Sequence, residues 1–478
     1  MKRRDFIAAG SGAIPVALMG ASRAPSADTM KRRPNILWIM TDQQPADALS
    51  CADNPDLQTP AMDSIAASGV RFELSYCVNP ICVPSRTTMA TGRMPHETGV
   101  MFNTDRFDVR FECIGTRMKQ AGYETAYIGK WHIPMDTENA EWHGYDLMME
   151  GTKEFNDRHF PKYVNEFLKK DHDKPFFLVA SLVNPHDICE FARKLSDFPK
   201  NTELWNGPIP PVPPPDQCPE LPENFAIPEN EPDIIREHQT WLPSAYPSRN
   251  WDEGTWRQYR WGLNRLTERV DSEIAKILDT LRAQGLDKNT IVVLVSDHGD
   301  GNAEHRWNQK TLLYDSTARV PFVVSGPGVA VPGRVDDTHL ISTGLDILPT
   351  FCDYAEIDPP EGMRGLSVRS LVEGRPVKWR NEVVSECDLH RQYGLSGGVF
   401  GRMLRTDRYK YIAYSAGKLR EQLFDMKKDP GEMNNLAVDP AYQSVLEDHR
   451  KRLALRIRET NDFFVVPEVS YDGWTLKR

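Results

Sequence analysis

The sequence lacks several features that mark common classes of protein. Its 478 residues contain no CxxC pair and no later run of about 20 apolar residues, which argues against a zinc ribbon and a membrane span. The eight cysteines have no regular spacing, so we expect no small disulfide scaffold. The formal net charge of −10 shows no general excess of basic residues, so we expect no nucleic-acid partner.

The composition is that of a folded, water-soluble protein. Hydrophobic residues make up 40% of the chain and charged residues 26%, values ordinary for a globular enzyme. At this length we expect either two domains or one large α/β domain with a smaller appendage. The negative charge does not exclude an anionic substrate, because a few cationic groups and a metal can focus positive potential in one cleft.

The first 27 residues have the pattern of an export signal. A basic start is followed by a weakly apolar middle, and small residues between Ala21 and Ala27 suit cleavage. Arg3 and Arg4, followed by Asp5 and Phe6, indicate the twin-arginine type. We therefore predict an exported protein, periplasmic or extracellular, with a basic cytosolic tail as the alternative.

Four apolar runs predict buried strands, and each is followed by a polar cluster. They cover residues 35–40, 125–128, 176–183 and 290–295. Helical spacing between them is clearest from Leu263 to Leu281 and stops at Gly285. This order predicts an α/β fold with a large, mostly parallel or mixed sheet and helices on both faces. Ligands of such sheets bind beyond the carboxyl ends of the strands, where the polar clusters lie.

The organisation changes twice along the chain. Residues 34–374 are predicted to form the catalytic α/β domain, with a proline-rich insertion near 199–247 that is either a substrate-side wall or a long loop. From residue 375 to 478 the pattern shifts to short strand-like pieces, turns and one helix near Tyr442 to Arg458. We expect a smaller carboxyl-terminal α+β subdomain, made of an antiparallel sheet and a helix.

Two polar clusters suit one divalent cation. Asp42 and Gln43 follow one predicted strand, and Asp297 and His298 follow another. Two carboxylates, an amide oxygen and an imidazole at adjacent strand ends form a reasonable ligand set, although either pair alone would also suit a turn. We expect calcium, with manganese as the alternative because an imidazole ligand suits it better.

Further cationic and imidazole groups lie on the loops after other strands. Lys130 and His132 follow the second run, His186 follows the third, and Lys310 ends the polar stretch that contains His305. Together they would surround an anion from several sides, with His305 as an additional substrate-binding candidate. A single lysine or histidine on a loop is more often solvated or structural, so this prediction depends on convergence.

The segment NPICVPSR places Cys82 next to Pro84 and before a predicted helix. A free cysteine is commonly a small buried hydrophobe. Here proline suits the first turn of the helix, so Cys82 would lie at a helix amino terminus, which favours anions.

The segment around Cys82 resembles the sequence signature of a known family. Cys82 to Arg86, followed by Thr91–Gly92–Arg93, resembles the C-x-P-S-R…T-G-R signature of type I sulfatases in the alkaline phosphatase superfamily. The other clusters, and Leu423–Asp425, occur in the family's order over nearly all of the mature chain. The resemblance implies that a maturation enzyme converts Cys82 to Cα-formylglycine. It also implies hydrolysis of a sulfate ester, with a sulfated sugar or polysaccharide fragment as the expected partner.

Roles follow from the resemblance position by position. Asp42, Gln43, Asp297 and His298 would hold the metal together with modified Cys82, and Arg86 would stabilise that side chain. Lys130 and Lys310 would bind sulfate oxygens, His132 would handle the formylglycine hydroxyl, and His186 would be the general acid. A hydrated aldehyde has two hydroxyls, one to attack sulfur and one to release sulfate, which divides one hard step into two.

Some positions depart from the pattern of many arylsulfatases. Gln43 stands where many have an acid, and His298 stands where many have asparagine. This pair also resembles phosphonate monoester hydrolases and choline sulfatases. The alternatives are therefore a phosphonate monoester or phosphodiester hydrolase, a choline-sulfatase-like enzyme, and a noncatalytic carbohydrate-binding relative. The sequence predicts no oligomeric state.

Overall fold

The computed structural model describes residues 33–107, 111–196, 203–241, 248–389 and 398–467. The predicted export signal, residues 1–27, lies outside these ranges. Within them, no helix combines the length and the apolar character needed to cross a membrane. All eight cysteines lie within these ranges, and none of them forms a disulfide.

A mixed sheet of eight strands forms the centre of the molecule. Its strands, in spatial order, are β5 (Leu147–Glu150), β4 (Glu124–Gly129), β6 (Phe176–Pro185), β1 (Asn35–Asp42), β7 (Thr290–Ser296), β8 (Phe322–Ser325), β2 (Gly69–Phe72) and β9 (Arg334–Asp336). The first five are parallel, and β8 runs antiparallel to both of its neighbours. The predicted large mixed sheet is therefore confirmed.

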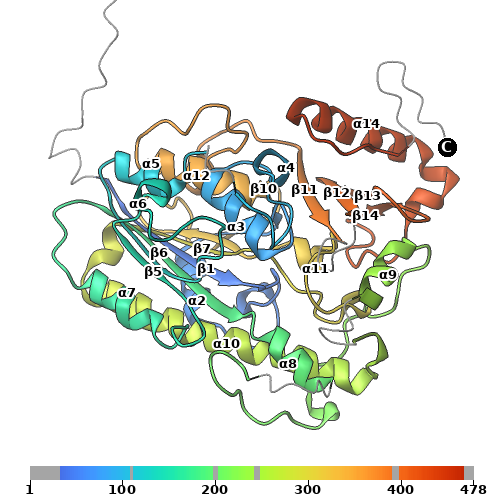
Figure 1. Ribbon diagram of the computed structural model, residues 1–478, viewed down its shortest axis with the longest axis horizontal. Helices are drawn as coiled ribbons and strands as arrows, with labels where there is room; N and C mark the ends of the chain where they lie inside the picture. The colour runs from blue at the N-terminus through green and yellow to red at the C-terminus, as the bar shows by residue number, and fades with distance from the viewer. Residues whose placement is uncertain (1–32, 108–110, 197–202, 242–247, 390–397, 468–478) are drawn as a thin grey trace, which may run out of the picture.

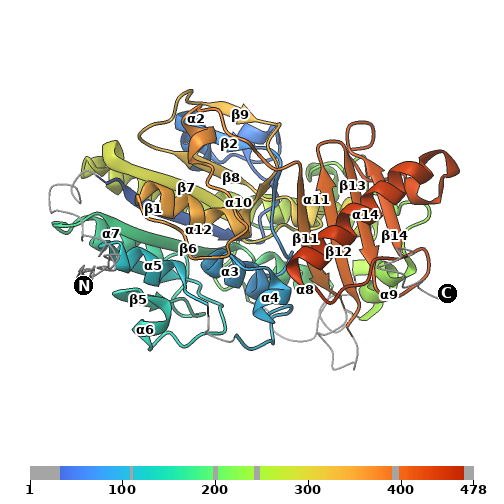
Figure 2. The ribbon, with the colours of Figure 1, turned by 90° about the horizontal axis from the view of Figure 1, so that it is seen from above.

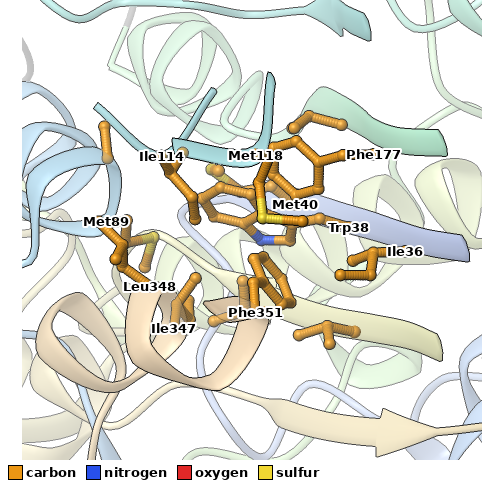
Figure 3. Packing of buried hydrophobic residues seen from close by; sticks show 14 of the residues in the cluster. Ile36, Trp38, Met40, Met89, Ile114, Met118, Phe177, Ile347, Leu348 and Phe351 are labelled. Atoms are coloured by element: carbon orange, nitrogen blue, oxygen red, sulfur yellow. The ribbon is translucent and has the colours of Figure 1, made fainter. Parts of the chain in front are cut away.

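Helices cover both faces of this sheet (Figure 1). One face packs against α3 (Cys82–Thr91), α5 (Ile114–Gln120) and α12 (Thr343–Tyr354), and the other packs against α2 (Pro60–Ser68), α7 (Phe160–Leu168) and α10 (Glu253–Ala283). Alternate residues of β1 supply the two cores: Trp38 points toward the first group of helices (Figure 3), and Leu37 belongs to the second core. Every β1 residue is buried, because the strand has helices on both sides.

The carboxyl-terminal part forms a separate four-stranded antiparallel sheet (Figure 2). Its strands are β11 (Glu382–Asp388), β12 (Phe400–Thr406), β13 (Tyr409–Tyr414) and β14 (Glu421–Asp425). One face packs on α14 (Gln443–Thr460), through Leu423 and Leu453 among others. The opposite face packs on the segment that contains Leu312 and Leu313. The predicted small antiparallel sheet with one helix is confirmed.

The described part of the proline-rich segment lies against α10. The helix side chains Arg257, Gln258 and Arg269 donate hydrogen bonds to carbonyls between Gly207 and Pro219. Proline has no N–H to pair, so carbonyl acceptors are the main backbone groups that this segment has to satisfy. Trp205 lies at its start, with its ring centroid 6.3 Å from that of His186.

The remaining α-helices and strands are short and connect these layers. They are β3 (Ser75–Tyr76), paired with β10 (Ile341–Ser342), together with α4 (Pro95–Thr98), α6 (Ala140–His143), α8 (Ile188–Leu195), α9 (Asp233–Trp241), α11 (Asp315–Ala318) and α13 (Arg369–Val372). The loop between β7 and α11 is the one that carries Lys310.

Candidate active site

The site lies at the carboxyl edge of the central parallel strands. Strands β1 and β7 are adjacent and in register, with Thr41 opposite Ser296, so the two predicted metal-binding pairs follow side by side. The backbone turns sharply after β1, where Gln43 has φ of 68°. Its N–H donates to Asp297 Oδ1 at 3.1 Å, which joins the two strand ends.

Arg86 bridges the two carboxylates. Its Nη2 donates to Asp42 Oδ2 and its Nε to Asp297 Oδ2, both at 2.7 Å. Its Nη1 donates to the Lys130 carbonyl at 2.8 Å and to Ser181 Oγ at 2.9 Å. Arg86 is buried, like every other residue of α3, and its planar guanidinium can satisfy several acceptors at once.

The two carboxylates differ in how readily they ionise. Burial alone would raise the pKa of Asp42, but Lys130, His186 and Arg86 outweigh burial and lower that pKa well below its usual range. Burial and the adjacent charge of Asp42 raise the pKa of Asp297 to about 6. When two carboxylates share a site, their mutual repulsion drives their pKa values apart in this way. A cation bound between them would favour the ionised form of both.

Cys82 lies where positive charge converges. Lys310 Nζ and His298 Nε2 both lie 3.1 Å from its sulfur, and Lys130 Nζ lies 3.9 Å away. Burial would raise the pKa of this thiol, but Lys130, Lys310 and His298 lower it well below its usual value. Cys82 is also the first residue of α3, as predicted, so the helix dipole adds to the stabilisation of negative charge. The surroundings of this side chain therefore favour an anion.

Two histidines form the solvent side of the cluster. His132 is exposed and His186 is partly buried, and both are within hydrogen-bonding reach of Cys82. Burial and the charges of Lys130 and Lys310 lower the pKa of His186 to about 4. His186 is therefore neutral in the free protein at neutral pH. A substrate would approach Cys82 past these two rings.

The donor set fits a divalent cation. Ligand atoms of Asp42, Cys82, Asp297 and His298 all lie within 4.8 Å of one another, and all four residues are buried. His298 Nδ1 lies 2.8 Å from the Gly299 carbonyl, so Nδ1 carries hydrogen and Nε2 is the nitrogen that faces the cluster. Burial would lower the pKa of His298, but Asp297 and Cys82 outweigh burial and raise it, so a cation bound at Nε2 would take the place of a proton. Two carboxylates and one imidazole nitrogen suit calcium or manganese. Gln43 Oε1 accepts from Lys310 Nζ at 3.1 Å, and the same ammonium contacts Cys82 Sγ.

The structure brings together ten of the predicted residues: Asp42, Gln43, Cys82, Arg86, Lys130, His132, His186, Asp297, His298 and Lys310. His305 is placed differently. Its ring is completely buried, stacks on Tyr314 with centroids 4.1 Å apart, and lies 2.9 Å from the Gly431 carbonyl through Nε2. A buried ring that packs against the carboxyl-terminal part cannot contact a substrate from solvent, so we do not include it in the site.

Two polar residues in the site were not predicted from the sequence. Ser181, in the middle of the apolar run of β6, accepts from Arg86. Asp300 accepts from the Gln43 side chain at 2.7 Å. Asp300 directly follows the predicted Asp297–Gly299 cluster, which was the available signal. Ser181 had no such signal, because it lies within a strand whose pattern is that of the core.

This constellation on a mixed α/β sheet defines a hydrolase of anionic esters with a metal-binding set beside the nucleophile position. Comparison of sequences gives the family. The sequence model described as "Sulfatase" matches residues 34–357, and the one described as "N-sulphoglucosamine sulphohydrolase, C-terminal" matches residues 303–459. The chain belongs to the sulfatase family, as a type I sulfatase of the alkaline phosphatase superfamily, and is a sulfuric ester hydrolase. The resemblance described above is thus confirmed.

Several relatives are similar over most of their length. The chain is 31% identical over 479 residues to a Delta 4,5-hexuronate-2-O-sulfatase of Bacteroides thetaiotaomicron, covering 95% of each chain. It is 28% identical to an N-acetylglucosamine-6-O-sulfatase of the same organism, covering 88% of this chain and 86% of that protein. A solved structure of a 2-O GAG sulfatase superimposes with a TM-score of 0.79 at 30% identity, covering 90% of this chain and 93% of that one.

The phosphonate monoester hydrolase of Agrobacterium radiobacter also has this fold. Its structure gives a TM-score of 0.72 at 20% identity, covering 90% of this chain and 96% of that chain. At this level of identity the similarity establishes the fold alone and does not assign a substrate.

Proposed function

We propose that this sulfatase removes sulfate from a sulfated carbohydrate, and that its nucleophile is a formylglycine made from Cys82 by a maturation enzyme. The observation that carries the proposal is the convergence of Lys310, Lys130 and His298 on the Cys82 side chain. The names of the relatives, a hexuronate-2-O-sulfatase and an N-acetylglucosamine-6-O-sulfatase, support a sugar as the alcohol.

The hydrated aldehyde would supply two hydroxyls, one for attack on sulfur and one for the release of sulfate. Lys130 and Lys310 would bind the sulfate oxygens and stabilise charge on the transferring group, a role that their closeness to the Cys82 side chain supports. Arg86 would hold the carboxylates in place, and His132 would bind a hydroxyl of the modified side chain.

His186 is the proposed acid for the leaving sugar hydroxyl. It lies on the solvent side of the cluster, where the alcohol portion of an ester would extend. Its low pKa in the free protein results from burial and from the two lysines. An anionic ester held by these lysines would offset their charge and favour the protonated imidazole. Substrate binding would therefore prepare His186 to donate a proton.

Asp42, Gln43, Asp297 and His298 would hold one divalent cation, which we propose to be calcium, with manganese as the alternative. The cation would supply electrostatic stabilisation of the ionised nucleophile. We further propose export by the residues 1–27 signal, and a division into a catalytic domain, residues 34–374, and a carboxyl-terminal subdomain, residues 375–478.

The test is a screen of defined sulfated monosaccharides and disaccharides with release of inorganic sulfate as the measurement. Protein produced with the maturation enzyme is expected to release sulfate from at least one sulfated sugar, and the Cys82→Ala variant is the control. Nitrophenyl sulfate, choline sulfate and a phosphonate monoester belong in the same screen. A preference for the phosphonate or for choline sulfate would refute the carbohydrate assignment, and Cys82 found unmodified in its natural source would support a noncatalytic relative.

A further inference from the structure

The Gln43 side-chain amide lies between a carboxylate and an ammonium group. On one side, its Nε2 donates to Asp300 Oδ2 at 2.7 Å. On the other side, its Oε1 accepts from Lys310 Nζ at 3.1 Å. If the amide were turned over, Nε2 would face the Lys310 ammonium and Oε1 would face the Asp300 carboxylate, which would set donor against donor and acceptor against acceptor. The amide orientation, often ambiguous, is therefore determined here by its neighbours.

Asp300 itself is surrounded by donors. Besides Gln43, it accepts from the Tyr259 hydroxyl at 2.9 Å, from Asn302 N at 2.8 Å and from Gln309 N at 3.2 Å. Tyr259 comes from α10, and both side chains are buried. A carboxylate has acceptor capacity for all of these donors, whereas an amide at the same position has an NH₂ group that would have to face one of them.

The two backbone donors are the ends of the loop that leads to Lys310. Asn302 and Gln309 both have positive φ, of 45° and 81°, and Gly301 N donates to the Gln309 carbonyl at 2.7 Å, which closes the loop at its base. Asp300 thus holds the base of the loop as well as the Gln43 amide. The same carboxylate therefore keeps Lys310 Nζ opposite Gln43 Oε1.

We infer that Asp300 is a positioning residue for Gln43 and the reason why position 43 carries an amide. It holds the amide with Oε1 turned toward Lys310 Nζ, which also lies 3.1 Å from Cys82 Sγ in the proposed metal site. A carboxylate at position 43 would lie within hydrogen-bonding distance of Asp300, where like charges repel. The Gln43–Asp300 pair instead places the acid against Gln43 Nε2, while Oε1 faces Lys310 Nζ. Asp300 would then support the proposed ligand without itself contacting the cation. This inference rests on the metal site proposed above.

The experiment is a charge swap with calcium binding as the measurement. Calcium titrations by calorimetry are made on the wild type, Gln43→Glu, Asp300→Asn and the double variant, with the state of Cys82 matched by intact mass. Each single variant is expected to bind calcium at least about tenfold more weakly. The double variant is expected to bind calcium more tightly than either single variant, because the NH₂ of the introduced asparagine can donate to the introduced glutamate as Gln43 now donates to Asp300. It should stay weaker than the wild type, because that NH₂ also faces the Gln309 N–H.

A purely structural role predicts a different result. If Asp300 only supports the loop, the double variant will bind calcium at least as weakly as either single variant, and this outcome overturns the inference. The inference is also overturned if Asp300→Asn lowers the unfolding temperature of the metal-free protein but leaves its calcium affinity unchanged. Asp271→Asn is the matched control: Asp271 is a buried acid that accepts from Ala61 N and Met62 N, and its replacement should leave calcium affinity unchanged.

Two further outcomes remain decisive. If Asp300→Asn does not fold, Gln43→Glu decides alone, because unchanged or tighter calcium binding by the added acid contradicts the predicted repulsion. If the wild type does not bind calcium, the same titrations are made with manganese; if it binds neither, the proposed metal site fails and the inference fails with it. Calcium binding by the wild type without recovery in the double variant refutes only the role of Asp300.

Discussion

Replacing Arg86 by methionine would remove the cation that holds two buried carboxylates. Arg86 pairs with Asp42 and Asp297 at 2.7 Å each, and all three side chains are almost completely buried. At an effective dielectric constant of about 20, each contact corresponds to a Coulomb energy of about 6 kcal/mol, largely offset by the desolvation of the ions. Loss of one partner from a buried pair costs about 3–5 kcal/mol, which is the loss that we expect in the free energy of unfolding.

The loss should depend on pH and on metal. Without Arg86, the lowered pKa of Asp42 rises and the pKa of Asp297, already raised, rises further, so both carboxylates take up protons more readily in acid and their repulsion is relieved. The difference in stability between wild type and variant should therefore be larger at pH 8 than at pH 5. Added calcium should reduce the difference, because a bound cation replaces part of the lost positive charge.

The assay is equilibrium urea unfolding followed by tryptophan fluorescence, in EDTA and then in calcium, with refolding curves to establish reversibility. Arg282→Met is the control, since Arg282 pairs with Asp279 at 3.1 Å on the surface, where we expect a change below about 1 kcal/mol. A loss below about 1 kcal/mol for Arg86→Met at pH 8 in EDTA would refute the reasoning, since it would mean that the two carboxylates need no buried counter-charge.

Three further predictions concern pH, catalysis and metal. Burial raises the pKa of Asp157 to about 7, above its ordinary 3.8, so the folded state holds this proton more tightly than the unfolded state does. The free energy of unfolding should therefore fall by about 4 kcal/mol as pH rises from about 4 to about 7. Asp157→Asn should flatten the stability profile in that window, and an unchanged profile would contradict the assignment. His186→Ala should reduce turnover of an alkyl sulfate by about 10²–10⁴ and of nitrophenyl sulfate much less, because a good leaving group needs no acid; equal losses would argue against the acid role. Removal of metal with EDTA should abolish sulfate release, and calcium or manganese should restore it; full activity in EDTA would exclude a metal requirement.

The general architecture was predictable because it depends on short-range patterns. Apolar runs such as residues 35–40 and 290–295 indicate buried strands, and the structure has β1 and β7 there. The helix that begins at Cys82 was signalled by Pro84. The start of α10 was not predicted, because its first residues, from Glu253, form helix before the regular apolar spacing begins.

The sequence by itself determined the strand ends, and with them most of the residues of the site. Parallel strands bring their carboxyl ends to one edge, so polar clusters that follow such strands must meet. Only the tertiary structure decided how the loops between them are oriented. His305 lies in a loop whose backbone has positive φ at His305 and Arg306, which turns its ring into the interior, and no side-chain periodicity reveals this.

Asp300 is a site residue that the sequence pattern did not predict. Its carboxylate lies between Gln43, which follows β1, and Tyr259, which comes from α10. That meeting depends on the packing of a helix against a sheet edge, and local pattern carries no information about which side chains face each other there. The sequence therefore specifies which groups reach the site, and the packing of distant elements specifies which of them hold the others in place.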